Sequence, residues 1–245
     1  DQRITHSNAQ MAALAIDGLF EDPAEKSNVE VLTCGTSSPD QNLPSQASMV
    51  HGEAFAHPLE IYSLAGVCLT GLTALKTAYM SIMMGNSKNA VCSMSELVSP
   101  SLLAKFFDEE FRHEQEVSDH PALAFEKDFL RYMLSDGATA LYLKDEPEDG
   151  AINLEIEFIH MKSFANRQPA CMYMWSEARP DCSLKIWKEF DSSEIAEKSV
   201  WCIKQNVKLL NEHITRYFVD VIQEALEVHD VNPDEVRYVI PHISS

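Results

Sequence analysis

The stretch that decides the fold is residues 64–100, LAGVCLTGLTALKTAYMSIMMGNSKNAVCSMSELVSP. A short apolar run, Glu60 to Leu64, leads into it, and a second, Ala90 to Met94, lies near its end; both have the composition of buried strands. Between them, apolar residues recur at helical spacing until Gly85-Asn86, a pair typical of a helix C-terminus. Strand, helix and strand in this order favour an α/β fold with a buried sheet.

Cys68 stands where the first predicted strand turns into the helix. A thiol at a helix N-terminus faces unpaired backbone N–H groups and the positive end of the helix dipole, and both favour the thiolate. The position therefore indicates a nucleophile. The alternative is that Cys68 is a small buried residue, the commonest situation for a cysteine outside a disulfide. Position alone leaves both interpretations open.

The rest of the chain continues the alternation of strands and helices. Ser7 is a predicted N-cap for a helix that extends to Phe20, and a further helix is expected to begin near Ser45, after a loop marked by Pro39 and Pro44. The other predicted strands are residues 29–33, 138–143, 152–160 and 236–240. The other predicted helices are residues 102–107, 125–133 and a long stretch over 192–228, with one break.

The composition is that of an ordinary globular protein. The 245 residues are 45% hydrophobic and 23% charged, enough for a large core in one sizeable domain or two halves. No run of about 18 apolar residues occurs, so no membrane-spanning helix is predicted, and Asp1-Gln2-Arg3 shows no signal-peptide pattern. The net charge of −19 argues against a nucleic-acid partner.

The cysteines and histidines show no pattern of a metal site or a disulfide framework. The six cysteines lie far apart without a C-x-x-C pair, and the nine histidines include no H-E-x-x-H spacing. We therefore predict no bound metal and a reducing, cytoplasmic setting.

Five segments carry a family resemblance. In the nucleophile segment the matching positions are Cys68, Gly71, Ala74-Leu75, Gly85, Ala90-Val91 and Ser95-Glu96. The other four segments are Arg3 with Ser7 and Met11-Ala12; Gly35 to Asp40 with Pro44-Ser45; Asp136-Gly137-Ala138, with Ser135 in place of a glycine; and Tyr238 to His242. In this order they resemble the β-ketoacyl-acyl carrier protein synthase III group of thiolase-like condensing enzymes.

The resemblance implies a thiolase-like fold, a layered α-β-α-β-α duplication of two α/β halves. Residues 1–165 would form the N-terminal half with the nucleophile, and residues 166–245 would begin the C-terminal half with the catalytic histidine. By the family's plan the chain starts inside the first half, without its opening strand, and stops soon after His242. The resemblance therefore implies a fragment, or one piece of a longer polypeptide.

The resemblance also implies a catalytic site. Cys68 is the expected nucleophile, with its own backbone N–H as oxyanion donor, and His242 is expected to activate the thiol or bind a thioester carbonyl. The asparagine that completes this set in the family would lie beyond residue 245. Four further candidates are interpreted as structural: Cys92, Glu96, Asp136 and His160.

The implied activity is acyl loading on Cys68 from acyl-CoA or acyl carrier protein. A Claisen-type condensation with a malonyl or β-ketoacyl thioester follows, in fatty-acid or secondary-metabolite synthesis and without a permanently bound cofactor. The family is typically homodimeric, and the apolar segment Ala170 to Trp175 is a candidate for that contact. Its Met and aromatic residues 172–175 more often belong to a core or dimer interface than to a substrate tunnel, although Met is adaptable enough to line an acyl channel. The net charge of −19, with only 19 Lys and Arg, conflicts with binding an acidic carrier.

Two departures and one alternative refine this expectation. Ile243 replaces the glutamine that chain-initiating synthases more often have, which points to a specialised member. Ser37 and Ser38 occupy the loop in which hydroxymethylglutaryl-CoA synthases have a glutamate, which argues against that reaction. The alternative is a non-catalytic or acyl-transfer-only partner subunit of a thiolase-fold heterodimer; such subunits usually lack the cysteine, whereas Cys68 is present.

Overall fold

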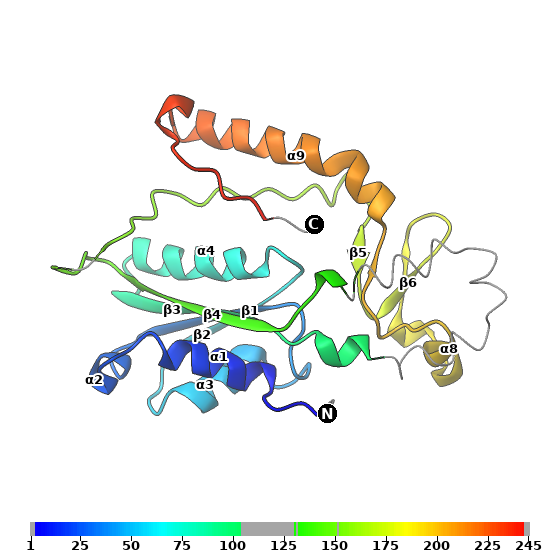
Figure 1. The fold of residues 1–245 in the computed structure, drawn as a ribbon, viewed down its shortest axis with the longest axis horizontal. Coiled ribbons are helices and arrows are strands. Elements are labelled where there is room, and N and C mark those ends of the chain that lie inside the picture. Colours follow the sequence, from blue (N-terminus) through cyan, green and yellow to red (C-terminus); the bar gives the residue numbers. More distant parts are fainter. Residues whose placement is uncertain (1–2, 104–129, 131, 151, 243–245) are drawn as a thin grey trace. The chain divides into compact units, whose positions relative to one another are not determined.

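A computed structural model of the chain describes residues 3–103, 130, 132–150 and 152–242. The chain divides into two compact units, each described by itself below. Unit 1 comprises Asp1–Pro100 and Ser135–Glu157, and unit 2 comprises Ser101–Leu134 and Phe158–Ser245. Unit 1 is therefore discontinuous in the sequence, as the colours of Figure 1 show.

Unit 1 is built on a four-stranded sheet in the order β2-β1-β3-β4. The strands are β1 (Val31–Thr36), β2 (Glu60–Ala65), β3 (Asn89–Glu96) and β4 (Gly137–Lys144). The first three are parallel, and β4 pairs antiparallel with β3. All six residues of β1 are buried, as expected for a central strand covered on both faces. The four strands that the sequence predicted in this unit's sheet are confirmed.

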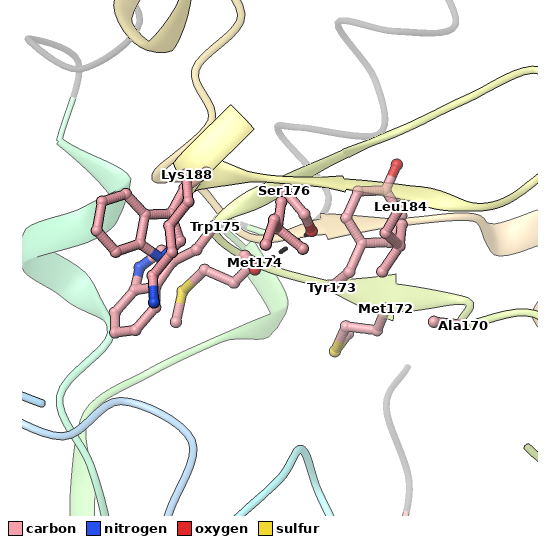
Figure 2. A pocket seen from close by; sticks show the side chains of 10 residues that line it. Ala170, Met172, Tyr173, Met174, Trp175, Ser176, Leu184 and Lys188 are labelled. Carbon is pink, nitrogen blue, oxygen red and sulfur yellow. Dashed lines mark hydrogen bonds between the residues drawn. The ribbon is translucent and has the colours of Figure 1, made fainter. Parts of the chain in front are cut away.

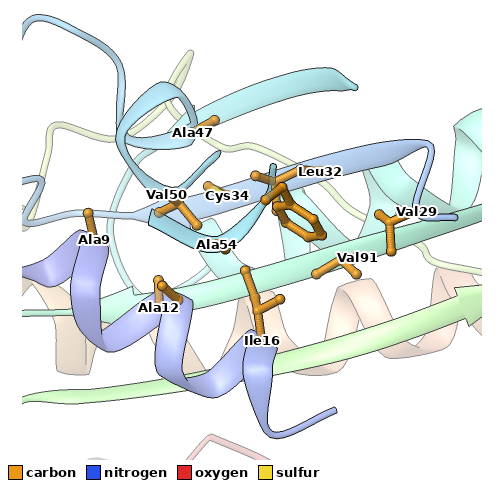
Figure 3. Close-up of a cluster of buried hydrophobic side chains, with 12 residues drawn as sticks. Ala9, Ala12, Ile16, Val29, Leu32, Cys34, Ala47, Val50, Ala54 and Val91 are labelled. Atoms are coloured by element: carbon orange, nitrogen blue, oxygen red, sulfur yellow. The ribbon is translucent and has the colours of Figure 1, made fainter. Parts of the chain in front are cut away.

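Helices cover both faces of this sheet (Figure 1). On one face, α4 (Thr70–Met83) buries Ala74 and Ala78 against side chains of β1 and β3. On the other face lie α1 (Asn8–Asp17) and α3 (Gln46–Ala54), and their small residues allow close packing. Figure 3 shows Ile16 of α1 pointing toward the strands that carry Leu32 and Val91. Unit 1 is thus an α-β-α sandwich.

The ends of the helices follow the local sequence. Ser7 caps α1 in a capping box, in which Ser7 and Gln10 each accept a hydrogen bond from the other's backbone N–H. Ser45 caps α3, as predicted. At the end of α4, Gly85 adopts a left-handed φ of 73°, and its N–H and that of Asn86 donate to carbonyls of the last turn. A short helix, α2 (Pro23–Lys26), connects α1 to β1.

The described residues of unit 2 include one long helix and two small antiparallel sheets. The helix is α9 (Val207–Val228). In the sheets, β5 (Met172–Tyr173) pairs with β8 (Lys204–Gln205), and β6 (Ser176–Ala178) pairs with β7 (Leu184–Ile186). The short helices described after residue 158 are η3 (Trp187–Glu189), α8 (Ser192–Glu197) and η4 (Pro233–Glu235). The helical stretch predicted over 192–228 is therefore two helices separated by the short strand β8.

Residues 158–168 make aromatic contacts with α9 and the turn after it. Phe164 stacks on Tyr217, with ring centroids 4.0 Å apart, and Phe158 stacks on His229 at 3.9 Å. His160 packs edge-on against His229 at 5.7 Å. These contacts give His160 a place in the packing of the segment, as the sequence predicted. No helix in the described part of the chain combines the length and apolarity needed to cross a bilayer.

Two predicted strands are wrong. Residues 152–160 and 236–240 have no regular secondary structure, and Ile152 and Ile240 are more than nine-tenths exposed. A strand needs a neighbour to pair its backbone groups, and among the described residues neither segment has one. Of the predicted helix 125–133, only residues 130, 132 and 133 are described, and they are helical. The predicted helix 102–107 lies outside the described residues after residue 103, and its first residue ends the 3₁₀ turn η1 (Ser99–Leu102).

Candidate active site

Cys68 lies in a turn between β2 and α4, where the parallel strands have their carboxyl ends. The backbone N–H of Thr70 donates to the carbonyl of Val67 at 2.9 Å, and the Thr70 hydroxyl donates to the same oxygen at 2.5 Å. The first residue of α4 therefore closes the turn around Cys68. The Cys68 side chain is exposed, so the interpretation of Cys68 as a small buried residue is wrong.

α4 begins two residues after Cys68. The helix begins at Thr70, and Leu69 at the cap position supplies no side-chain hydrogen bond to the first turn. Backbone N–H groups at the start of a 14-residue helix carry a partial positive charge that favours an anion. Cys68 thus lies next to the helix start at which the sequence predicted a thiolate.

Two glycines let the start of α4 approach the sheet closely. A Cβ on Gly35 of β1 would lie 2.6 Å from the carbonyl oxygen of Thr70, and a Cβ on Gly71 would lie 2.8 Å from Sδ of Met94 in β3. Real Cβ atoms do not approach other atoms to within 3.0 Å. At Gly35 the neighbouring atom is backbone, so the close approach of the start of α4 to β1 requires glycine; at Gly71 the neighbour is the Met94 side chain, which would have to shift.

The other two thiols of unit 1 are chemically different from Cys68. Cys34 in β1 and Cys92 in β3 are buried in the two faces of the sheet. Burial raises the pKa of Cys92 to about 11, and burial also raises the pKa of Cys34 above its ordinary value. Both thiols therefore stay protonated near neutral pH, and the structural role predicted for Cys92 is confirmed.

Glu96, at the end of β3, organises the loop that follows β1. Its carboxylate accepts hydrogen bonds from the backbone N–H of Ser37 at 2.8 Å and from its hydroxyl at 2.7 Å. It also accepts from the Ser38 hydroxyl at 2.5 Å, and that hydroxyl accepts from the N–H of Leu97 at 2.8 Å. Glu96 therefore ties the ends of β1 and β3 together, the structural role that the sequence predicted.

Asp136 fixes the segment that enters β4. One carboxylate oxygen accepts from the backbone N–H groups of Val98 and Ser99 at 2.7 and 2.8 Å, and the other accepts from the Ser99 hydroxyl at 2.5 Å. With these contacts Asp136 joins the segment after β3 to the segment before β4. The predicted constraint on this turn is confirmed.

Comparison with known proteins gives sequence relatives and fold neighbours. No protein-family model matches the chain. Two curated proteins named beta-ketoacyl-[acyl-carrier-protein] synthase III are similar in sequence. The one from Bradyrhizobium sp. is 23% identical over 235 residues, covering 96% of the chain and 60% of the relative. The one from Clostridium beijerinckii is 23% identical over 220 residues, covering 88% and 55%. The chain thus spans little more than half the length of these relatives.

Solved structures extend the likeness over nearly the whole chain. AbyA1, a tetronic acid condensing enzyme, has a TM-score of 0.63 at 17% identity and covers 96% of this chain and 60% of its own. A 3-oxoacyl-(acyl-carrier-protein) synthase III has a TM-score of 0.60 at 14% identity, covering 95% and 62%. The 3-oxoacyl-[acyl-carrier-protein] synthase III from Aquifex aeolicus has a TM-score of 0.54 at 17% sequence identity. The match covers 95% of this chain and 60% of that structure's chain. The fold is that of the thiolase-like condensing enzymes. The predicted α/β, thiolase-like fold class is confirmed.

His242, the second predicted catalytic residue, belongs to unit 2. It is exposed and follows the irregular segment 236–240, not the predicted strand. Cys68 belongs to unit 1, so the joint action of the two residues stays a prediction. Ile243, on which the expectation of a specialised member rests, lies outside the described residues. Across the described ranges, no group of three or more His, Cys, Asp or Glu side chains converges as metal ligands.

One feature of unit 2 was only partly predicted from the sequence. Unit 2 contains a hollow of about 450 Å³, lined by Ala170, Met172 to Ser176, Leu184 and Ile186 to Lys188. The aromatic and Met content of 172–175 favoured the core or a dimer contact, with an acyl channel as the less favoured interpretation. The sequence of residues 184–188 did not indicate a binding site, because only the pairing of β6 with β7 brings them next to the first lining segment.

Proposed function

We propose that this chain carries the acyl-accepting residue of a condensing enzyme of the β-ketoacyl-acyl carrier protein synthase III type. The observation that carries the proposal is the exposed thiol of Cys68 in the turn at the start of α4. The contacts of Gly35 and Gly71 with this region support it, because they hold the turn in one position against the sheet. The sequence similarity to two synthases of that name points to the same chemistry.

In the first step, the Cys68 thiolate attacks the carbonyl carbon of an acyl-CoA or acyl carrier protein thioester. The carbon–sulfur bond to the carrier breaks, and the carrier leaves as a thiol with the proton that Cys68 gave up. In the second step, the α-carbon of a malonyl or β-ketoacyl thioester takes the acyl group and frees Cys68. Loss of carbon dioxide supplies the carbanion when the second thioester is malonyl. When it is β-ketoacyl, the acidic α-carbon gives up a proton instead, and the released Cys68 thiolate takes up one proton to become a thiol again.

Two groups of this chain assist in the proposed reaction. The backbone N–H of Cys68 donates to the oxyanion that forms on the thioester carbonyl. His242 assists by activating the thiol or by donating a hydrogen bond to the second thioester. The proposal includes the assignment of residues 1–165 to the half with the nucleophile and of residues 166–245 to the half with the histidine. It also includes a cytoplasmic setting and no permanently bound cofactor.

The proposal further includes a homodimer. β2 is an edge strand of the unit 1 sheet, and within the described residues it pairs only with β1. Four of its six residues are exposed. An edge with unpaired backbone groups is suited to pairing with the same edge of a second copy, because antiparallel pairing of identical strands satisfies two-fold symmetry.

Intact-protein mass spectrometry tests the assignment of the nucleophile. The chain is incubated with acyl-CoA donors of increasing length and with acyl carrier protein loaded with the same groups. We expect one acyl group to replace one hydrogen, and we expect this adduct to disappear in Cys68→Ala. Cys182→Ser is the matched control, because Cys182 is also an exposed thiol but lies in unit 2, on the β6–β7 hairpin.

Two outcomes would contradict the proposal. An adduct that persists in Cys68→Ala and is lost in Cys182→Ser would assign acylation to the hairpin thiol. No adduct with any donor, from a chain in which iodoacetamide still alkylates Cys68, would show that an accessible thiol does not accept acyl groups. That result would favour a partner-subunit role.

A further inference from the structure

The hollow in unit 2 has the size and lining of a small-molecule site. Its volume of about 450 Å³ lies within the usual range for ligand pockets, about 300–1,000 Å³. β5, the β6–β7 hairpin and η3 form it, and its walls include Met172, Met174, Trp175, Leu184 and Trp187. Methionine side chains adapt their shape to a flexible apolar partner. This lining therefore suits an aliphatic chain.

Specific contacts hold one end of the hollow in shape. Trp175 has a left-handed φ of 60°, a conformation that bulky residues seldom adopt. Its carbonyl accepts a hydrogen bond from the N–H of Trp187 at 2.8 Å. The ring of Trp201 packs edge-on against Trp175 at 6.3 Å and tilted against Trp187 at 5.5 Å. The position of Trp175 is therefore fixed by its neighbours, so this end of the hollow has a defined shape without a ligand.

The apolar lining remains accessible to solvent. Ile186 and Trp187 are 47% and 39% exposed, and the adjacent Trp201 is 42% exposed. Large apolar side chains gathered at a concave surface and left in contact with water are characteristic of a binding site.

A single positive charge accompanies this apolar lining. Of the described residues that line the hollow, Lys188 alone is charged, and its ammonium lies 5.5 Å from the ring centroid of Trp187. Within the described part of the chain Lys188 has no ion pair, whereas three nearby lysines each have a glutamate partner: Lys185, Lys198 and Lys204. In a chain with a net charge of −19, an ammonium without a carboxylate partner favours an anionic group on the ligand.

The charge lies at one end of the hollow. In Figure 2, Lys188 and Trp175 lie toward one end, and Leu184 and Ala170 lie toward the other. A ligand that fits this arrangement has an anionic group at one end and an apolar chain that extends from it.

We propose that this hollow binds an amphiphile with an aliphatic chain and an anionic head group, a carboxylate or a phosphate. The ligand's aliphatic chain lies along the methionines and Leu184, and its head group pairs with Lys188 beside Trp187. The site belongs to unit 2 alone, and binding there requires no acylation of Cys68.

The tryptophans provide a direct measurement. The chain has three, Trp175, Trp187 and Trp201, and all three line the hollow or contact its lining. Intrinsic tryptophan fluorescence therefore reports this part of the molecule. The Cys68→Ala chain is titrated with octanoate, decanoate and dodecanoate below their micelle concentrations, and with dodecyl phosphate and dodecanol. We expect a saturable change, with affinity rising about fourfold per methylene until the hollow is full.

The head group is tested by removing the charge of Lys188. In Lys188→Met we expect dodecanoate to bind about two- to fivefold more weakly and dodecanol to bind as before, since a partly exposed ion pair contributes a modest amount. Lys208→Met is the matched control, because Lys208 is an exposed lysine of α9 outside the hollow, and its replacement changes the net charge equally. It is expected to bind every ligand like the parent chain.

The possible outcomes separate the alternatives. Tighter binding of dodecyl phosphate or of dodecanoate supports the proposal and identifies the head group. Equal affinity for dodecanoate and dodecanol overturns the role of Lys188, and an absent or chain-length-independent response overturns the site. Fluorescence that changes with protein concentration alone, with a matching rise in mass by sedimentation equilibrium, assigns the hollow to a contact between copies and also overturns the proposal.

Discussion

Replacing Gly35 with alanine tests whether contacts with the sheet position Cys68. The added Cβ would lie 2.6 Å from the carbonyl oxygen of Thr70 and 3.1 Å from Cβ of Ala74. Ordinary contacts of a Cβ begin at 3.4 Å, so the Thr70 oxygen has to recede by about 0.8 Å, the difference between 3.4 and 2.6 Å. Because this oxygen belongs to the backbone, relief of the contact requires β1 or the start of α4 to move.

The expected magnitudes follow from this displacement. Adding a methyl group to a packed site costs about 1–3 kcal/mol, and for a chain of this length each kcal/mol lowers the melting temperature by about 2–4 °C. Cys68 lies two residues before Thr70 and moves with the start of α4. A displacement of about 1 Å at a reacting group slows a reaction by roughly 100-fold. We therefore expect Gly35→Ala to have a lower melting temperature and a much slower acylation of Cys68.

The assay combines thermal denaturation, followed by far-UV circular dichroism, with the rate of acylation followed by intact mass. Gly52→Ala is the control, since no atom lies within 4 Å of a Cβ at Gly52 in α3. It is expected to be more stable by about 0.4–1 kcal/mol, with unchanged acylation. A Gly35→Ala chain that melts and acylates like the parent would refute the conclusion that this contact positions Cys68.

Two further predictions concern unit 1. Asp136→Ala removes the acceptor of three hydrogen bonds at residues 98–99 and is expected to destabilise the chain by about 1–3 kcal/mol in urea denaturation; a smaller loss in Asp136→Ala than in Asp136→Asn would contradict this. The free energy of unfolding is expected to fall as pH rises from 9 to about 11, because burial raises the pKa of Cys92 from 9.0 to about 11. Below pH 9 the thiol is protonated in both states, and above it only the unfolded state ionises readily. Urea denaturation across this range should give a shallower slope for Cys92→Ala, and an unchanged slope would show that Cys92 is not the cause.

The parts of unit 1 that the sequence predicted well are those fixed by local chemistry. Ser7 and Ser45 identified helix starts because a hydroxyl at the cap satisfies an N–H of the first turn. Gly85 identified the end of α4 because a left-handed residue terminates a helix most easily when it is glycine. Cys68 was located in the correct turn because the strand before it and the helix after it both had clear patterns.

The errors concern features that depend on distant residues. Residues 236–240 are apolar enough for a strand, but apolar composition does not supply a partner with which to pair. The role of Gly35 was not predicted in detail, because its close neighbour Thr70 lies on another element. The hollow of unit 2 was only partly predicted for the same reason, since its two lining segments meet through the β6–β7 hairpin.

The discontinuity of unit 1 has a consequence during synthesis on the ribosome. The parallel strands β1, β2 and β3 emerge first, but β4 emerges only after residues 101–134 have been made. At about 5–20 residues per second, the side of β3 that β4 will cover waits several seconds for its partner. An unpaired apolar strand edge is open to pairing with another nascent chain. Asp136, at the entrance to β4, anchors the late strand to residues 98–99 as soon as it arrives, which ends the interval of greatest exposure to aggregation.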